Sequence, residues 1–174
     1  SVCIGSIEDI LTDCIYYFVR SSTRDFIAKY DIKADYATFI AVDISKTPNL
    51  VDANGNPLTL DPFLKFTGKQ ITAINIIDNY LFWSDGDNEP KKIDLSKNYS
   101  GLQSNPQSDN HHSRLILNGV NYGYLKEEHL TVIKKKPLRA PQIKVISSKG
   151  NEKSSIFERQ IPRFCVRYKY EDNQ

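Results

Sequence analysis

Apolar residues alternate with polar ones along much of this chain, at a spacing of two residues. Because successive side chains of a β-strand point to opposite faces, this spacing predicts strands that bury one face each. Short connections rich in Gly, Asp, Asn and Ser favour antiparallel meanders. The chain is therefore expected to be all-β, with strands over residues 1–7, 14–20, 26–31, 38–43, 71–77, 80–83, 91–95, 114–120 and 129–134.

The stretch 71–95 shows this organisation most clearly. It reads as three short strands joined by two tight turns, and the aromatic run at 80–83 suits a packed, pleated surface. The second turn, residues 84–90, contains an Asp-Gly pair that tolerates positive φ and a proline that cannot donate to a central ladder. Three strands cannot bury their faces alone, so Trp83 is predicted to pack in a core with neighbouring elements.

An earlier stretch, residues 4–31, has the same order of residue types. Its segments align with the later stretch at offsets of 67, 66 and 63 residues, which places Ile15-Tyr16-Tyr17-Phe18 on Leu81-Phe82-Trp83-Ser84. We interpret this as an internal repeat, and repeated four-stranded sheets set radially are the blades of a β-propeller. Tyr16 and Tyr17 are then core residues like Trp83. Two unrelated hairpins that share common strand residues are the alternative.

The pattern divides the chain into two parts joined by a linker. Residues 1–134 are predicted to form propeller blades, with an insertion at 45–69 and a flexible loop at 98–113. Two prolines stiffen the linker at 135–141. Residues 142–174 resemble the incomplete start of an immunoglobulin-like β-sandwich, whose strand at 161–170 would be half-buried with a basic outer face.

Composition adds little that is specific. The 174 residues carry a formal charge of +2, which gives no reason to expect nucleic-acid or membrane attachment through bulk charge. The sequence contains no run of 18 apolar residues, so no membrane-spanning segment is predicted. The absence of Met suggests a segment of a longer polypeptide. Cys3, Cys14 and Cys165 are predicted to be buried free thiols, with a Cys3–Cys14 pair across a hairpin as the alternative.

Candidate chemistry is sparse, and no catalytic, cofactor-binding or metal site is predicted. The start of a calcium loop at 52–56 lacks the expected Glu, so a plain turn is favoured. His111 and His112 have no further ligand at metal spacing. The basic cluster at 134–139 has no interleaved aromatic residues and is interpreted as a solvated linker rather than a phosphate-binding patch. Motifs for nucleophilic or metal-dependent catalysis are missing, so the chain is expected not to be an enzyme.

Residues 81–86 with 89–94, LFWSDG and EPKKID, resemble the YWTD blade of low-density-lipoprotein-receptor-type propellers. The stretch 71–95 followed by EEHLTVIKKKPLRAP and PRFCVRYKYED is similar to a large tail structural protein, of nozzle or muzzle type, in crAss-like short-tailed Bacteroidota phages. The similarity covers most of residues 4–172. Cys165 departs from the sandwich strand of that family.

This resemblance implies a virion structural protein located in the phage tail. Several copies would form an oligomeric ring as the distal tail conduit for DNA ejection, with other tail proteins and other segments of the same polypeptide as partners. Genome DNA would pass through transiently, and host-surface contact is possible. Two alternatives stay open: a cell-surface or host-receptor-binding β-propeller adhesion module, for which Tyr99 and Tyr122 give weak support as loop aromatics, and a polysaccharide-cleaving tail enzyme.

Overall fold

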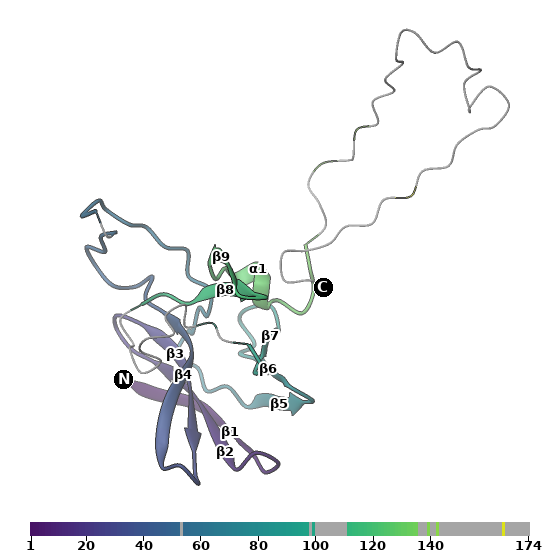
Figure 1. Ribbon diagram of the computed structural model, residues 1–174. Coiled ribbons are helices and arrows are strands. Elements are labelled where there is room, and N and C mark those ends of the chain that lie inside the picture. Colours follow the sequence, from purple (N-terminus) through teal and green to yellow (C-terminus); the bar gives the residue numbers. More distant parts are fainter. Residues whose placement is uncertain are drawn as a thin grey trace, which may run out of the picture. The chain divides into compact units, whose positions relative to one another are not determined.

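The computed structural model describes residues 1–52, 54–97, 99, 111–135, 139, 142 and 165. The chain divides into two compact units, Ser1–Lys134 and Lys135–Gln174, and every helix and strand below belongs to the first. Within the described residues the fold is built from antiparallel sheets and one short helix, which confirms the β-rich prediction (Figure 1). None of these described sheets closes on itself. The predicted linker and sandwich lie almost wholly outside the described residues.

Four antiparallel strands form the first sheet in chain order, with boundaries within two residues of their predicted ranges. The central strands β2 and β3 pair along their whole length, from Cys14 opposite Asp31 to Arg20 opposite Asp25. β1 and β4 are the edges of this sheet. The four strands are β1 (Val2–Asp9), β2 (Cys14–Arg20), β3 (Asp25–Asp31) and β4 (Tyr36–Asp43).

Three antiparallel strands form the second sheet, as predicted for the stretch 71–95. They are β5 (Ala73–Ile77), β6 (Tyr80–Ser84) and β7 (Lys91–Asp94). The outer edge of β7 is extended by a single bridge, in which Thr131 lies opposite Lys91 and the Val132 amide donates to the Pro90 carbonyl at 3.0 Å.

The strand predicted at 129–134 is wrong apart from this bridge. The helix α1 (Glu127–Leu130) occupies its first part, and the Thr131 amide donates to the Glu127 carbonyl at 3.1 Å to close the helical turn. Leu130 is buried in the core, and the Glu127 carboxylate accepts a hydrogen bond from Lys65 of the insertion. These long-range contacts fix a helix that alternation in the sequence does not indicate.

A separate hairpin follows the second sheet, formed by β8 (Arg114–Leu117) and β9 (Val120–Tyr124). The predicted strand 114–120 therefore ends early at Leu117, and Tyr122, expected on a loop, lies in β9. Asn118 and Gly119 both have positive φ, 52° and 78°, as a tight two-residue hairpin turn requires. Among the described residues β8 pairs only with β9, so it does not complete the second sheet.

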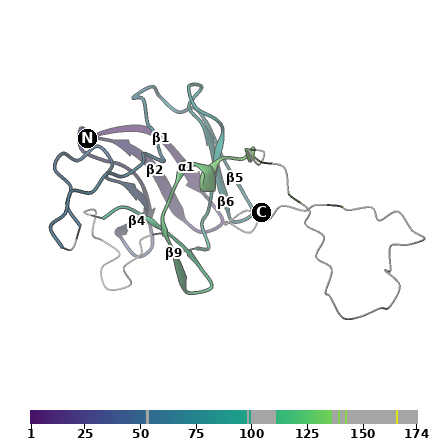
Figure 2. The same ribbon diagram turned by 90° about the horizontal axis from the view of Figure 1, so that it is seen from above.

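The two larger sheets share one apolar core, and the views of Figures 1 and 2 both place β1 beside β5. Phe18 of β2 and Trp83 of β6 meet edge to face, with ring centroids 5.5 Å apart and little exposure of either side chain. The Ile71 amide donates to the Ile4 carbonyl at 2.7 Å. Gly5 permits this close approach, since a Cβ there would lie 2.9 Å from the Ile71 carbonyl oxygen.

The structure shifts the alignment between the two stretches of the predicted repeat by one residue, so that Phe18 and not Tyr17 corresponds to Trp83. Tyr16 and Phe18 face the core from β2, as Leu81 and Trp83 do from β6, whereas Tyr17 is half-buried on the opposite face. The prediction that Trp83 and Tyr16 are core residues is confirmed, and that for Tyr17 is wrong. Apolar residues occupy both faces of β2, so alternation alone could not select the inward one.

The insertion at 45–69 packs on both sides of the first sheet. Phe63, Leu64 and Phe66 are buried in the shared core and hold the insertion against the sheet. On the opposite side Leu60 joins a smaller cluster with Val42 and Ile44, against which Phe26 and Phe39 pack. The insertion thereby covers the part of that second face that lies near the end of β4.

Candidate assembly surface

Two buried aspartates hold the insertion on the first sheet. Asp43, at the end of β4, accepts hydrogen bonds from the amides of Phe63 and Leu64 at 2.7 and 2.9 Å. Asp25 binds the Lys46 ammonium at 2.5 Å and the Phe66 amide at 3.2 Å. Burial raises the pKa of Asp25, although Lys46 opposes that shift. These carboxylates satisfy backbone donors that would otherwise be buried without a partner.

His112 lies beside Asp43, but the arrangement is not that of a Ser-His-Asp triad. Its Nδ1 is 3.7 Å from the Asp43 carboxylate, and its Nε2 lies 3.4 Å from the Leu125 carbonyl oxygen. The neighbouring Ser113 hydroxyl accepts a hydrogen bond from the Val42 amide at 2.8 Å. Burial lowers the pKa of His112, with Asp43 opposing that shift. The cluster therefore fastens β4 to the segment before β8.

A buried lysine marks the edge of the second sheet. The Lys91 side chain is 1% exposed, and its ammonium lies 3.3 Å from the Glu127 carboxylate of α1. The other oxygen of Glu127 binds Lys65 of the insertion at 2.5 Å. Burial raises the pKa of Glu127, but hydrogen bonds and the two lysine charges outweigh it and lower that pKa. This ion-pair group joins three segments that are distant in sequence.

The second face of the first sheet is apolar, and we call its uncovered part the outer face. It comprises side chains of β2 and β3 that point away from the shared core and are each half-exposed: Ile15, Tyr17, Val19, Ala28 and Tyr30. Ile15 lies opposite Tyr30 and Tyr17 opposite Ala28, so the side chains form contiguous cross-strand pairs. No described residue outside the sheet belongs to an apolar cluster with these five.

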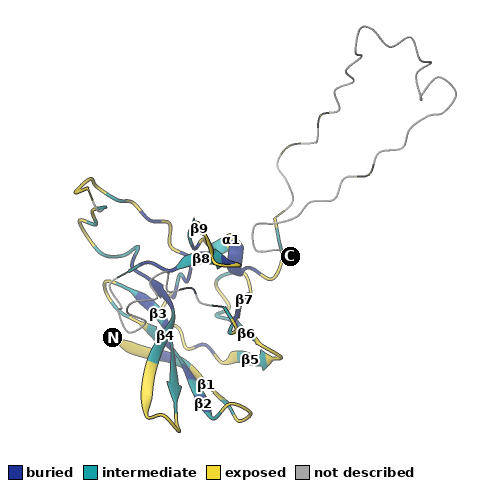
Figure 3. Cartoon of the chain, viewed as in Figure 1, coloured by how far each residue is buried: buried dark blue, intermediate teal, exposed yellow. Residues whose placement is uncertain are grey.

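The hairpin turns at one end of this sheet carry a second apolar group. Ile10 and Leu11 of the β1–β2 turn are 77% and 95% exposed, and Tyr36 beyond the β3–β4 turn is 48% exposed (Figure 3). The two turns are held together, because the Ile32 amide donates to the Asp13 carbonyl at 3.0 Å. Exposed apolar side chains on a fixed pair of turns are typical of a contact surface.

The second sheet also exposes a mostly apolar concavity on the face away from the core. A shallow cavity of about 290 Å³ is lined there by Ala73, Phe82 and Val132, among others. Phe82 is half-exposed, and the rings of Tyr80 and Phe82 are 6.3 Å apart. Both sheets therefore present apolar area on the side opposite the core that they share.

Several predicted residues lie elsewhere than expected. Cys14 is buried as predicted, but Cys3 and Cys165 are exposed. Cys3 lies opposite Val19, at the other end of the β1–β2 ladder from Cys14, which rules out a pair across the hairpin. Tyr99 is buried rather than exposed on a loop, and its hydroxyl accepts the Asp94 amide at 3.3 Å.

The two ends of the predicted flexible loop, around Tyr99 and His112, are buried, and the loop between them lies outside the described residues. The predicted calcium-like turn is centred on Asp52, which accepts the amides of Asn54 and Asn56 at 2.8 and 2.9 Å. The described part of the chain holds no group of three or more potential metal ligands.

A short sequence pattern marks the ends of two strands. The tetrapeptides Asp43-Ile44-Ser45-Lys46 and Asp94-Leu95-Ser96-Lys97 follow the same pattern. In both, the Asp carboxylate accepts the amide and the hydroxyl of the Ser two residues later, with hydroxyl distances of 2.6 Å. The motif ends the last strand of each large sheet, β4 and β7, and would have located the buried Asp43.

Comparison of the chain with protein-family models, with curated proteins and with solved structures finds no match. No helix in the described ranges is long and apolar enough to cross a membrane.

Proposed function

We propose that this chain is a structural module of a phage tail, whose two large sheets are blades of a β-propeller ring in a nozzle- or muzzle-type assembly. The observation that carries the proposal is the outer face. A sheet that is apolar on both sides requires a neighbour on both sides, and the second sheet covers only one. Radially packed blades provide such neighbours.

The arrangement of the two sheets supports this proposal. Both are antiparallel meanders in chain order, and they pack through the aromatic pair Phe18–Trp83 with their first strands adjacent. Further sheets would come from other copies of this chain or from other segments of the same polypeptide. The exposed turns around Leu11 add a contact surface for other tail proteins. The module would thus form part of the wall of a conduit for DNA.

The first experiment tests location. Tailed phage particles are purified from a culture that produces this chain, and an antibody against the β1–β2 turn is used for immunogold labelling together with peptide mapping. We expect peptides from residues 1–134 in several copies per particle and label at the tail end. Particles that lack these peptides would overturn the proposal.

A second experiment tests the outer face with the full chain. The substitution Tyr17→Asp places a charge on that face, whereas Val120→Asp places one on β9, where the native side chain is 54% exposed. Light scattering is expected to show a multi-copy assembly for the native chain and for Val120→Asp, and a smaller species for Tyr17→Asp with unchanged circular dichroism. A monomeric native chain at all concentrations would refute a ring built from copies of it.

A further inference from the structure

Each of the two large sheets has a mostly apolar side that points away from the core they share. On the first sheet this side is the outer face, where Tyr17 lies opposite Ala28. On the second sheet it carries Asn75 and Phe82, which lie opposite each other beside the cavity of about 290 Å³, and we call it the concave face. Because the two faces lie on opposite sides of one pair of sheets, a single copy cannot bring them into contact.

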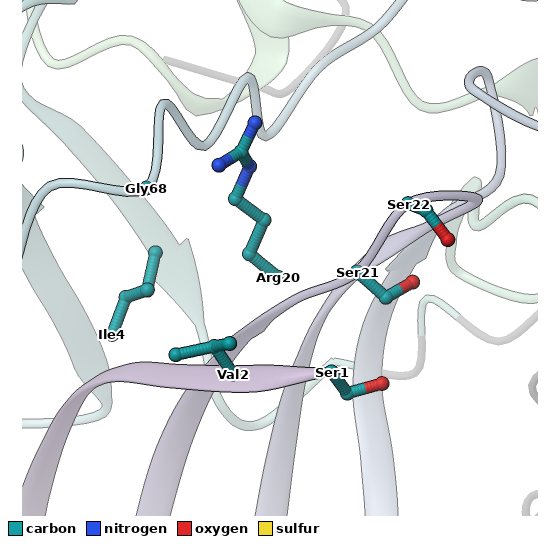
Figure 4. Close-up of a pocket in the computed structure, with 7 residues that line it drawn as sticks. All are labelled: Ser1, Val2, Ile4, Arg20, Ser21, Ser22 and Gly68. Atoms are coloured by element: carbon teal, nitrogen blue, oxygen red, sulfur yellow. The ribbon is translucent and has the colours of Figure 1, made fainter.

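The outer face of β2 is uncharged along its length. Arg20, the last residue of β2, alternates in phase with the core-facing Phe18. Figure 4 shows its side chain extending from the strand towards the loop that carries Gly68, beside a cavity at the start of β1. Tyr17 and Val19 alternate with Phe18 and Arg20 and therefore point to the other side. The guanidinium thus leaves the outer face open to an apolar contact.

The packing inside the chain shows how the two faces can pair. Phe18 and Trp83 join the sheets at a centroid distance of 5.5 Å. Tyr17 directly precedes Phe18 and Phe82 directly precedes Trp83, so each face carries an aromatic side chain next to the position used in the core. Repeating this sheet-on-sheet packing between copies places Tyr17 of one copy against Phe82 of the next. A cavity of about 150 Å³ is enough for a benzene ring, so the hollow beside Phe82 has room for the phenol ring.

The concave face also offers a partner for the Tyr17 hydroxyl. A tyrosine hydroxyl usually forms a hydrogen bond once its ring is covered. Asn75 lines the cavity, and its Oδ1 accepts the amide of Ile76 at 2.8 Å. Its Nδ2 makes no hydrogen bond in the described part of the chain, so this group can donate to the hydroxyl of a seated tyrosine.

The charges at the two faces have opposite signs. Glu8 of β1 is exposed and lies opposite Ile15, at the edge of the outer face. Lys92 lies opposite Phe82 on the concave face, and its ammonium is 5.3 Å from the centroid of the Tyr80 ring. A contact between the two different faces brings these opposite charges together, whereas a contact of either face with its own kind would pair like charges.

From these features we infer that the outer face of one copy packs on the concave face of the next, with Tyr17 seated beside Phe82 and bonded to Asn75. The inference rests on the proposed ring and names the contact that builds it. The occupant of each face is a second copy of this chain, because the aromatic positions, the polar groups and the charges of the two faces match. Such a head-to-tail contact is heterologous, and repeated copies close into a ring when the rotation between them permits.

The test mixes two full-length variants, each with one face disrupted by a charge. Tyr17→Asp disrupts the outer face and Phe82→Asp the concave face, and sedimentation velocity is expected to show a monomer for each. An equimolar mixture should form a dimer and nothing larger, because it retains one intact pair of faces. Ala73→Asp, at an exposed position beside the cavity, replaces Phe82→Asp if circular dichroism shows that the latter is unfolded. Val120→Asp, outside both faces, should assemble like the native chain.

A single contact is weaker than a closed ring, so the mixture is also followed by NMR. In labelled Tyr17→Asp, the amide signals of Ala73 and Ser84 should shift and saturate when unlabelled Phe82→Asp is added, but not when unlabelled Tyr17→Asp is added. No shift in the mixture, or native assembly of both concave-face variants, would overturn this contact. If the native chain still assembled and Tyr17→Asp did not, the proposed ring would stand, whereas a monomeric native chain would refute both.

Discussion

Replacing Trp83 by alanine tests the contact between the two large sheets. Trp83 is 3% exposed and meets Phe18, itself fully buried, at a centroid distance of 5.5 Å. Truncating a buried aromatic residue to alanine costs about 3–5 kcal/mol, from lost apolar burial and the cavity left behind. A domain of this size is stable by about 5–15 kcal/mol, so the variant should lose a large fraction of its free energy of unfolding.

Two further variants separate the sources of this cost. Trp83→Phe keeps an aromatic ring and removes the indole Nε1, a buried donor without a hydrogen-bond partner among the described residues. Because burying such a donor is itself unfavourable, this variant should lose less than half as much as Trp83→Ala. In a double-mutant cycle with Phe18→Ala, the aromatic pair should show a coupling of about 0.5–1.5 kcal/mol.

The assay is equilibrium unfolding of the full chain in urea, followed by far-UV circular dichroism. Fluorescence is unsuitable because Trp83 is the only tryptophan in the chain. Phe82→Ala is the control, since Phe82 neighbours Trp83 but is half-exposed on the opposite face, and about 1 kcal/mol is expected. A loss below about 1 kcal/mol for Trp83→Ala would refute the placement of this residue between the sheets.

Two other predictions concern the buried charges. Glu127→Gln leaves the ammonium of Lys91, which is 1% exposed, without its counter-charge, and should cost about 1–3 kcal/mol in urea unfolding. Glu128→Gln, at a side chain that is 61% exposed, should change almost nothing, and equal losses for the two would contradict the role of Glu127. His112 has a pKa lowered by burial, so the unfolded chain binds its proton more readily and stability should fall as the pH drops below about 6.5. His112→Gln should flatten the pH dependence of the unfolding free energy between about pH 6.5 and 5, and an unchanged slope would show that another group titrates there.

The positions of most strands follow from the sequence alone, for a local reason. Side chains that alternate with period two and turns such as Asn118-Gly119 constrain the backbone through neighbouring residues. The ranges of β2 and β6 were therefore predictable, and so was the burial of Trp83. The paired Asp-x-Ser motifs at Asp43 and Asp94 carry the same kind of local information.

Only the tertiary structure decided which side of β2 faces the core and which charges are buried. Tyr16 and Tyr17 are chemically equivalent, and the choice between them depends on the second sheet packing against one face. Lys91 is buried because Glu127, distant in sequence, supplies its counter-charge. Such choices depend on free energies of contact between remote segments, which no periodicity along the chain records.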